Sequence, residues 1–247
     1  MLLAIDVGNT STKLALFDGD TLVKRSTFPT DRAASVESLK GQIQNEIDAD
    51  VTDAIACSVV PEINEALSDA IRDTFGVELC LVRTSDDFGL TFLGSVEHAG
   101  TDRLVNSFAA AKLYGVPVIL ISFGTATVIE AIDGERRHLG GLIASGMRTS
   151  AKALELATSK LPEIEIAKPT SVVGYDTVDA IRSGLFYSQV GLVERVVKQL
   201  KEKIGKEAKV IATGGFASMI ADECDCVDVV DKDLTVNGLR MLYSRGT

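Results

Sequence analysis

The chain is poor in several residue types, and their scarcity excludes several classes of function. Its 247 residues include no tryptophan, four tyrosines and nine phenylalanines, so aromatic platforms for stacking nucleic-acid bases are scarce. Positive charge is also short: 25 basic residues face 35 acidic ones, for a net charge of −10. That balance disfavours nucleic acid or an anionic membrane surface as a general partner. No apolar run approaches the roughly 20 residues needed to span a bilayer, and Asp6 interrupts the apolar N-terminus, which argues against a signal peptide.

Cysteine is sparse as well, which favours a reducing, cytoplasmic environment. The four cysteines are Cys57, Cys80, Cys224 and Cys226. The close pair near the C-terminus has no second pair at zinc-ligand spacing, and the chain offers only two histidines, His98 and His138, as further ligands. We therefore interpret the cysteines as structural or incidental. The 46% hydrophobic content is typical of a globular chain, and the length suits one large domain or two smaller ones.

The N-terminal stretch is the first with a chemical pattern. An apolar run, residues 2–5, predicts a buried strand that ends at Asp6. Gly8 permits a tight turn and a close approach of the backbone to a bound group, and a second strand over residues 14–17 closes at the acidic turn 18–20. Between them lie Asn9, Thr10, Ser11, Thr12 and Lys13. Two interpretations stay open from these residues alone: a site for a metal ion and phosphate oxygens, or an ordinary hairpin with a polar turn.

The same pattern recurs in the second half of the chain. Residues 118–135 again give an apolar strand, a glycine-hydroxyl turn, a second strand and an acidic glycine turn. Gly8 and Gly124 lie 116 residues apart, and in each copy a third strand follows, over residues 22–28 and 137–143. This self-similarity predicts two related halves, which we assign to residues 1–115 and 116–247. Two facing turns of this kind could grip the phosphates of a nucleotide from opposite sides.

The remaining segments predict an α/β fold in which helices cover mixed sheets. Apolar spacing and flanking residues predict helices over residues 35–47, 64–75, 101–115, 148–158, 178–187 with a continuation or restart to 204, and 234–243. A buried strand is expected over residues 54–60, further strands over residues 77–82 and 209–215, and loops over residues 86–99 and 161–171.

The segment Gly100-Thr101-Asp102-Arg103 opens one of these helices. Thr101 is a natural N-cap, and Asp102 in the first turn suits the helix dipole. The same two charged residues, Asp102 and Arg103, would also present a base and an anion clamp to solvent. Glycines at 140–141 and 214–215 allow either close approach to a ligand or tight packing between strand and helix.

Taken in order, the motifs resemble those of type III pantothenate kinases, over essentially the whole chain. They are Asp6-Val7-Gly8-Asn9-Thr10, Gly100-Thr101-Asp102-Arg103, Gly124-Thr125-Ala126-Thr127, Gly140-Gly141, Gly174-x-x-Thr177 and Thr213-Gly214-Gly215. The resemblance implies the actin/sugar-kinase/Hsp70-like fold of the acetate and sugar kinase superfamily: two ribonuclease-H-like halves, each a mixed sheet flanked by helices. It also implies a cytoplasmic homodimer with the pantothenate site near the subunit interface.

The implied reaction is transfer of the ATP γ-phosphate to the 4′-hydroxyl of pantothenate, the first step of coenzyme A synthesis. By resemblance, Asp6 would organise magnesium and phosphates, and Asp102 would accept the proton of the attacking hydroxyl. The other ATP-binding residues would be Val7, Gly8, Asn9, Thr10, Ser11, Thr12, Lys13 and Thr125. Pantothenate would be bound by Gly100, Thr101, Asp102, Arg103 and Thr177. Such a site suits phosphoryl transfer, which needs in-line positioning, charge neutralisation and a carboxylate near the nucleophile.

The chain departs from the family pattern at several positions. Ser122 stands where the family usually has the aspartate of its monovalent-cation site, so a requirement for potassium or ammonium is left open. The other departures are Leu93 for Tyr, Val128 for Thr, Glu130 for Asp and Ser145 for Pro. Three hypotheses therefore remain: an active pantothenate kinase, a kinase-like binding or regulatory protein with weakened or no activity, and a kinase for another small hydroxyl compound.

Overall fold

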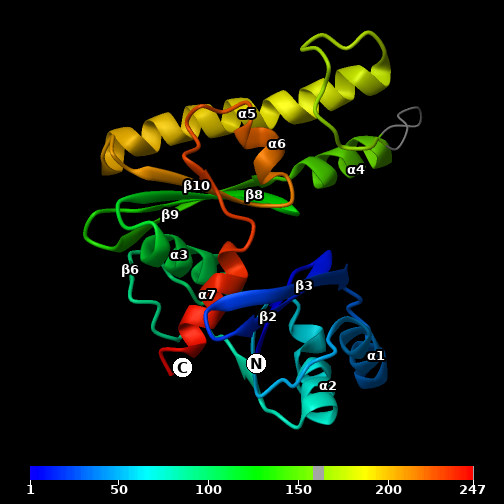
Figure 1. Ribbon diagram of the computed structural model, residues 1–247. Coiled ribbons are helices and arrows are strands. Elements are labelled where there is room, and N and C mark those ends of the chain that lie inside the picture. The colour runs from blue at the N-terminus through cyan, green and yellow to red at the C-terminus, as the bar shows by residue number, and fades with distance from the viewer. Residues whose placement is uncertain (158–163, 247) are drawn as a thin grey trace. The chain divides into compact units, whose positions relative to one another are not determined.

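A computed structural model describes residues 1–157 and 164–246 (Figure 1). Its strands are β1 (Leu2–Val7), β2 (Ser11–Asp18), β3 (Thr21–Pro29), β4 (Asp53–Ser58), β5 (Leu79–Leu81), β6 (Thr91–Phe92), β7 (Val118–Phe123), β8 (Ala126–Ile132), β9 (Arg137–Ser145), β10 (Lys209–Gly214) and β11 (Val229–Val230). Its helices are α1 (Val36–Glu46), the short η1 (Pro61–Ile63), α2 (Asn64–Phe75), α3 (Thr101–Leu113), α4 (Met147–Ala157), α5 (Thr177–Ile204), α6 (Ala217–Ala221) and α7 (Leu234–Tyr243). The predicted α/β class with two mixed sheets is confirmed.

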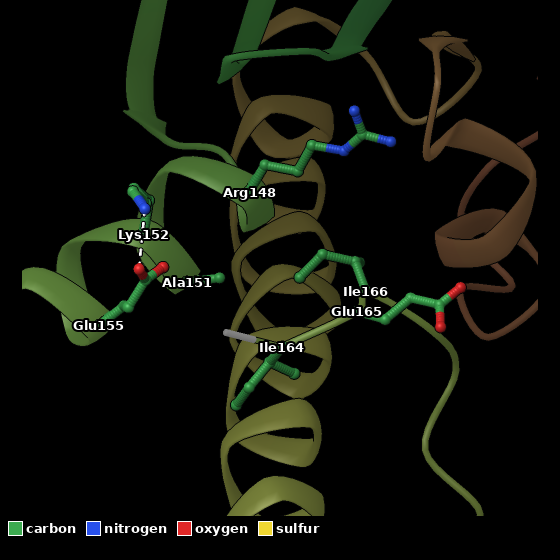
Figure 2. A pocket seen from close by; sticks show the side chains of 7 residues that line it. All are labelled: Arg148, Ala151, Lys152, Glu155, Ile164, Glu165 and Ile166. Atoms are coloured by element: carbon green, nitrogen blue, oxygen red, sulfur yellow. Dashed lines mark hydrogen bonds and ion pairs between the residues drawn. The ribbon is translucent and has the colours of Figure 1, made fainter. Parts of the chain in front are cut away.

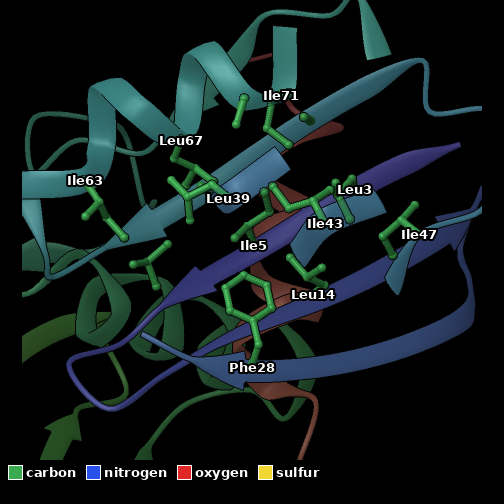
Figure 3. Packing of buried hydrophobic residues seen from close by; sticks show 14 of the residues in the cluster. Leu3, Ile5, Leu14, Phe28, Leu39, Ile43, Ile47, Ile63, Leu67 and Ile71 are labelled. Carbon is green, nitrogen blue, oxygen red and sulfur yellow. The ribbon is translucent and has the colours of Figure 1, made fainter. Parts of the chain in front are cut away.

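The first sheet has the strand order β3-β2-β1-β4-β5. Its first three strands are joined by tight turns and pair antiparallel, whereas β4 and β5 follow helical crossovers and pair parallel. Alternate residues of β1, Leu3, Ile5 and Val7, face the apolar sides of α1 and α2 and form one core with them (Figure 3). The intervening residues, Asp6 among them, therefore face the opposite side of the sheet.

The second sheet has the order β11-β10-β7-β8-β9-β6, which repeats the first order and adds β6 at the edge. The repeated strand-turn-strand unit predicted from the sequence is thus present in both sheets. The turn after β1 has four residues between the paired Val7 and Thr12, and the turn after β7 has three between Phe123 and Thr127. This single residue explains why the two glycine turns lie 116 residues apart while the hairpins that follow lie 115 apart.

Contacts group the described residues into two compact units. The first contains residues 1–90, 95–109 and the segment from Asp233 onward; the second contains residues 91–94 and 110–232. The predicted division into residues 1–115 and 116–247 stays a prediction. Helix α7, although it is the last element of the chain, contacts β1, β4 and β2 and so belongs to the first unit.

Most predicted elements are confirmed, with small differences at their ends. Helix α5 is one continuous helix of 28 residues, so the alternative of a restart near Gly191 is wrong. Thr101 is not an N-cap but the first helical residue of α3, because the carbonyl of Gly100 accepts from the amides of Arg103 and Leu104 at 3.0 and 3.4 Å. Position 158 of the predicted fourth helix, and positions 161–163 of the predicted loop, lie outside the described residues. Across residues 1–157 and 164–246, every helix is too short or too polar to cross a bilayer.

Candidate functional site

Asp6 lies at the end of β1 and is 94% buried, although it is an aspartate. Strand pairing explains its surroundings: β1 places it opposite Lys13 of β2 on one side and opposite Cys57 of β4 on the other. The Lys13 ammonium donates to Asp6 Oδ2 at 2.8 Å, and the Cys57 thiol donates to Asp6 Oδ1 at 3.6 Å. Each oxygen of this buried carboxylate therefore has a donor, as burial of a charge requires.

The turn from Gly8 to Thr12 is closed by backbone hydrogen bonds. The Gly8 amide donates to the Ser11 carbonyl at 3.1 Å, and a Cβ at Gly8 would lie 3.0 Å from that same oxygen. A side chain at position 8 would thus press on the turn, so glycine suits the position sterically. Asn9 and Thr10, at the tip of the turn, are exposed to solvent.

The flanks of this turn are held by β3 and the segment after it. The carbonyl of Thr10 accepts from the amide of Thr30 at 3.2 Å, and the hydroxyls of Thr12 and Thr30 lie 2.9 Å apart. Arg32 donates to the side chain of Asn9 at 2.7 Å. The predicted phosphate-binding residues therefore form one ordered turn with Asp6 at its base.

The start of α3 lies beside the end of β4 in the same unit. The Thr101 hydroxyl accepts from the Ser58 amide and donates to the Ser58 carbonyl, both at 3.1 Å, which ties the helix to the strand next to Cys57. A Cβ at Gly100 would lie 2.4 Å from Asp102 Oδ1. Gly100 thus leaves room for the Asp102 carboxylate, which accepts from the Arg103 amide at 2.9 Å.

The charged residues at these strand and helix ends act on one another electrostatically. The negative charge of Asp6 is the main cause that raises the pKa of Lys13, and Asp102 acts in the same direction. Burial raises the pKa of the Cys57 thiol well above its usual range, with both carboxylates adding to the rise. Lys13 is accordingly a stable cation, and Cys57 is a protonated thiol. Cys57 is the residue that the sequence analysis missed, because only the strand register brings it to Asp6.

The second turn, from Gly124 to Thr127, belongs to the other unit and is held by different hydrogen bonds. The Thr125 carbonyl accepts from the Gly146 amide at 3.1 Å and from the Thr149 hydroxyl at 2.6 Å. Gln189 of α5 accepts from the Thr127 hydroxyl at 2.6 Å and donates to the Ser145 carbonyl at 3.2 Å. The predicted ATP contact, Thr125, thus lies in a turn fixed by α4 and by the middle of α5.

The position matching Asp6 carries no charge in this turn. Ser122 pairs with Val128 in the register in which Asp6 pairs with Lys13, so a carboxylate and an ammonium are replaced by a hydroxyl and an isopropyl group. Glu130, another departure from the family pattern, is buried, and its carboxylate lies 3.2 Å from His138 Nε2. The Gly140 amide donates to His138 Nδ1 at 3.3 Å, which leaves Nε2 as the protonated nitrogen that donates to Glu130.

Thr177 lies apart from the second turn within the same unit. It is the first residue of α5, exposed to solvent, and follows Asp176, whose side chain caps the helix by accepting from the Asp179 amide at 2.8 Å. Gln189, which contacts the turn, is 12 residues further along, or about 18 Å along the helix axis. The residues just before Thr177 are apolar and exposed: Val172 by 65%, Val173 by 68% and Tyr175 by 92%.

A pocket of about 380 Å³ lies between α4 and residues 164–166 (Figure 2). Its lining has both signs of charge, with Lys152 and Glu155 paired at 2.8 Å. Arg148 points away from that pair, and its guanidinium lies 5.3 Å from the ring centre of Phe216. None of the predicted site residues lines this pocket, so it does not account for the predicted site.

The donor set around Asp6 fits magnesium better than zinc or copper. Within the described part of the chain, no three histidine, cysteine or acidic side chains gather closely enough to hold a metal by themselves. Magnesium is commonly bound by one or two carboxylates together with substrate phosphates and water, and needs no complete protein cage. A single buried carboxylate beside an ordered glycine-hydroxyl turn meets that requirement.

Comparisons with known proteins agree on one family. A family model described as type III pantothenate kinase matches residues 2–199. A type III pantothenate kinase from Agathobacter rectalis is 38% identical over 254 residues, which cover 99% of this chain and 97% of that protein. Another from Halalkalibacterium halodurans is 38% identical over 252 residues and covers 99% of each.

Solved structures that resemble the chain are much more distant in sequence and show the fold alone. One from Campylobacter jejuni, described as a conserved Baf family transcriptional activator, superposes with a TM-score of 0.63 at 18% identity and covers 98% of both chains. An inorganic polyphosphate/ATP-glucomannokinase from an Arthrobacter species gives a TM-score of 0.50 at 16% identity, covering 99% of this chain and 98% of its own. Both support the two-sheet α/β architecture.

Proposed function

The chain belongs to the type III pantothenate kinase family, and on that premise we propose that it transfers the γ-phosphate of ATP to pantothenate. This is the first step of coenzyme A synthesis. At the level of residues, the proposal rests on the cluster of Asp6, Lys13 and Asp102 at neighbouring strand and helix ends.

The residues have distinct roles in this proposal. The Gly8–Thr12 turn and Lys13 bind the phosphates of ATP, since backbone amides and an ammonium neutralise their charge. Asp102 accepts the proton of the pantothenate hydroxyl, and Gly100 leaves the room in which that carboxylate is oriented. Thr101 anchors the helix start to Ser58, and Arg103 helps to hold the carboxylate of pantothenate.

Asp6 is the residue that would hold magnesium. When bound, the ion neutralises phosphate charge. The protein's own contribution is to keep the Asp6 carboxylate buried and aligned between two donors, one of which, Lys13, is half-exposed and near the turn. Thr125 adds a contact to ATP from the second turn.

The monovalent-cation position is where this chain departs from the family chemistry. The position that matches Asp6 is Ser122, whose neutral hydroxyl is a weaker ligand for potassium or ammonium than a carboxylate. We propose that turnover proceeds with little dependence on either cation.

We also propose that the protein is a cytoplasmic homodimer. The four cysteines, all within the described residues, form no disulfide, which suits a reducing compartment. Val172, Val173 and Tyr175 expose an apolar surface next to Thr177, about 18 Å along α5 from the contact with the second turn. A second copy that covered this surface would bring Thr177 to a pantothenate site near the interface. Light scattering coupled to gel filtration tests the dimer, and a monomer at micromolar concentration would contradict it.

The test of function is ADP release coupled to pantothenate, with Asp102→Asn as the variant. Asn keeps the size of the side chain but cannot accept the proton, so we expect turnover to fall about 10²- to 10⁴-fold with ATP binding retained. Asp179→Asn is a matched control, because Asp179 is a half-exposed carboxylate in the first turn of α5.

The outcomes separate the three hypotheses. Turnover abolished only by Asp102→Asn supports the kinase. Nucleotide binding without pantothenate-dependent turnover, at any potassium or ammonium concentration, would favour a binding or regulatory protein. Turnover with another small alcohol in a substrate panel, but not with pantothenate, would assign a different substrate.

A further inference from the structure

Cys57 is a buried polar group that the proposed mechanism does not use. It lies in the middle of the first unit, fully buried, one residue before the end of β4. It does not belong to the apolar core beneath α1 and α2, because it points to the same side of the sheet as Asp6, its partner in the parallel register.

The two donors on Asp6 differ in how firmly they are held. Lys13 reaches Oδ2 with a long, flexible side chain that is 46% exposed. Cys57 reaches Oδ1 from a short side chain whose Cβ is fixed by a central strand paired on both sides. Lys13 can therefore move from Asp6 to a nearby phosphate, whereas Cys57 cannot leave.

Neutralising ATP phosphates and pairing with Asp6 compete for one ammonium. If Lys13 turns to the phosphates, Asp6 Oδ2 becomes available to a divalent cation. The Asp6 carboxylate then loses its ion pair with Lys13, which is the stronger of its two restraints. The remaining restraint is the thiol on Oδ1. The helix start next to it adds another, because Thr101 fixes the backbone of Ser58, the neighbour of Cys57.

We propose that Cys57 is a positioning residue that orients the Asp6 carboxylate toward the metal–nucleotide complex through its hydrogen bond to Oδ1. The inference rests on the proposed function, since it assigns Asp6 to magnesium. The second unit provides the contrast: there Ser122 takes the place of Asp6, and Thr213 takes the place of Cys57. A hydrogen-bond donor on the central parallel strand is thus retained in both sheets, but only the first sheet has a carboxylate for it to orient.

The experiment is calorimetric titration of the whole chain with the non-hydrolysable analogue adenylyl imidodiphosphate, with magnesium and with EDTA. The variants are Cys57→Ala, which removes the donor, and Cys57→Ser, which keeps a donor at the same place. Cys80→Ala is the matched control, since Cys80 lies on the edge strand β5 away from the register of Asp6.

For Cys57→Ala we expect the tightening that magnesium confers on nucleotide binding to fall at least about threefold, because a hydrogen bond to a charged group is lost. Binding in EDTA should stay as in the wild type, since the phosphate-binding turn and Lys13 are unchanged. Cys57→Ser should restore the effect of magnesium, and Cys80→Ala should leave it intact. A merely structural role of Cys57 would weaken binding equally with and without magnesium.

Two results would overturn the inference. One is an effect of magnesium in Cys57→Ala equal to that in the wild type. The other is a loss that Cys57→Ser does not reverse. A wild-type chain whose nucleotide affinity is the same in magnesium and EDTA would instead contradict the assignment of Asp6 to magnesium, and with it the proposed function, so the two failures are distinguishable.

Discussion

Replacing Gly146 with alanine should destabilise the second unit through the turn that follows β7. A Cβ at this position would lie 2.4 Å from the Gly124 carbonyl oxygen, 2.6 Å from the Thr125 carbonyl oxygen and 3.0 Å from the Thr125 carbonyl carbon. All three are backbone atoms, so no side-chain rotation relieves the overlap. The Gly146 amide also donates to the Thr125 carbonyl, and moving the chain away would lengthen that bond.

The size of the effect follows from these contacts. Overpacking a buried position costs typically about 1–3 kcal/mol, and we expect about 3 kcal/mol here because only backbone movement can make room. For a protein of this size, 1 kcal/mol shifts the melting temperature by about 2–4 °C, so Gly146→Ala should melt roughly 6–12 °C lower. Calorimetry with and without ATP measures this, and ATP affinity should also fall because Thr125 moves.

Gly184→Ala provides the matched control. Gly184 lies within α5, and among the described residues no atom outside the adjoining turns of the helix's own backbone lies within 4 Å of a Cβ built there. In a helix interior the same substitution should stabilise by about 0.5–1 kcal/mol, since glycine loses more backbone entropy on folding. A melting temperature of Gly146→Ala within about 2 °C of the wild type would refute the reasoning, as would equal destabilisation by both substitutions.

Three further predictions concern other contacts. Ser122→Asp restores a carboxylate at the position matching Asp6 and should create or strengthen activation by potassium; equal turnover with and without potassium in both forms would contradict this. Thr127→Val leaves the buried Gln189 acceptor unpaired and should lower the free energy of unfolding by about 1–3 kcal/mol in denaturant titration. The hydroxyl of Tyr243 donates to Asp53 and lowers the pKa of that carboxyl. The free energy of unfolding that Tyr243→Phe loses should therefore be greatest above about pH 4, and the loss should shrink as the pH falls through the lowered pKa of Asp53. Melting curves recorded between about pH 2.5 and 7, at intervals of about one pH unit, test this.

Local patterns predicted the elements well because each carries its own signal. The apolar run before Asp6 and the glycine at position 19 define a strand and its hairpin whatever surrounds them, and Gly19 adopts the positive φ of 55° that such a turn needs. The mixed character of the sheets followed from the same elements, since sequential hairpins pair antiparallel and helical crossovers return the chain parallel. The internal repeat then predicted the second sheet from the first.

Residues whose role depends on a contact with a distant segment could not be found from local patterns. Cys57 meets Asp6 only because β4 aligns with β1 in one particular register, and a shift of one residue would turn the thiol to the other face. Gln189 contacts the second turn from the middle of a long helix. Helical spacing places it on the same buried face as Phe186 and Val193, but that pattern does not identify the distant group that it meets. Both depend on contacts between segments that are distant in sequence.

The return of α7 to the first sheet has a consequence for synthesis on the ribosome. Domains generally fold as units, with the N-terminal one first. Here the N-terminal sheet lacks α7 until residues 110–232 have been made, so its face around Phe17 stays uncovered while the second unit can already fold. Arg240, whose guanidinium lies 5.7 Å from the ring centre of Phe17, is translated after the whole second unit. The part that begins translation should therefore be the last to become stable, and a chaperone would find its binding site there.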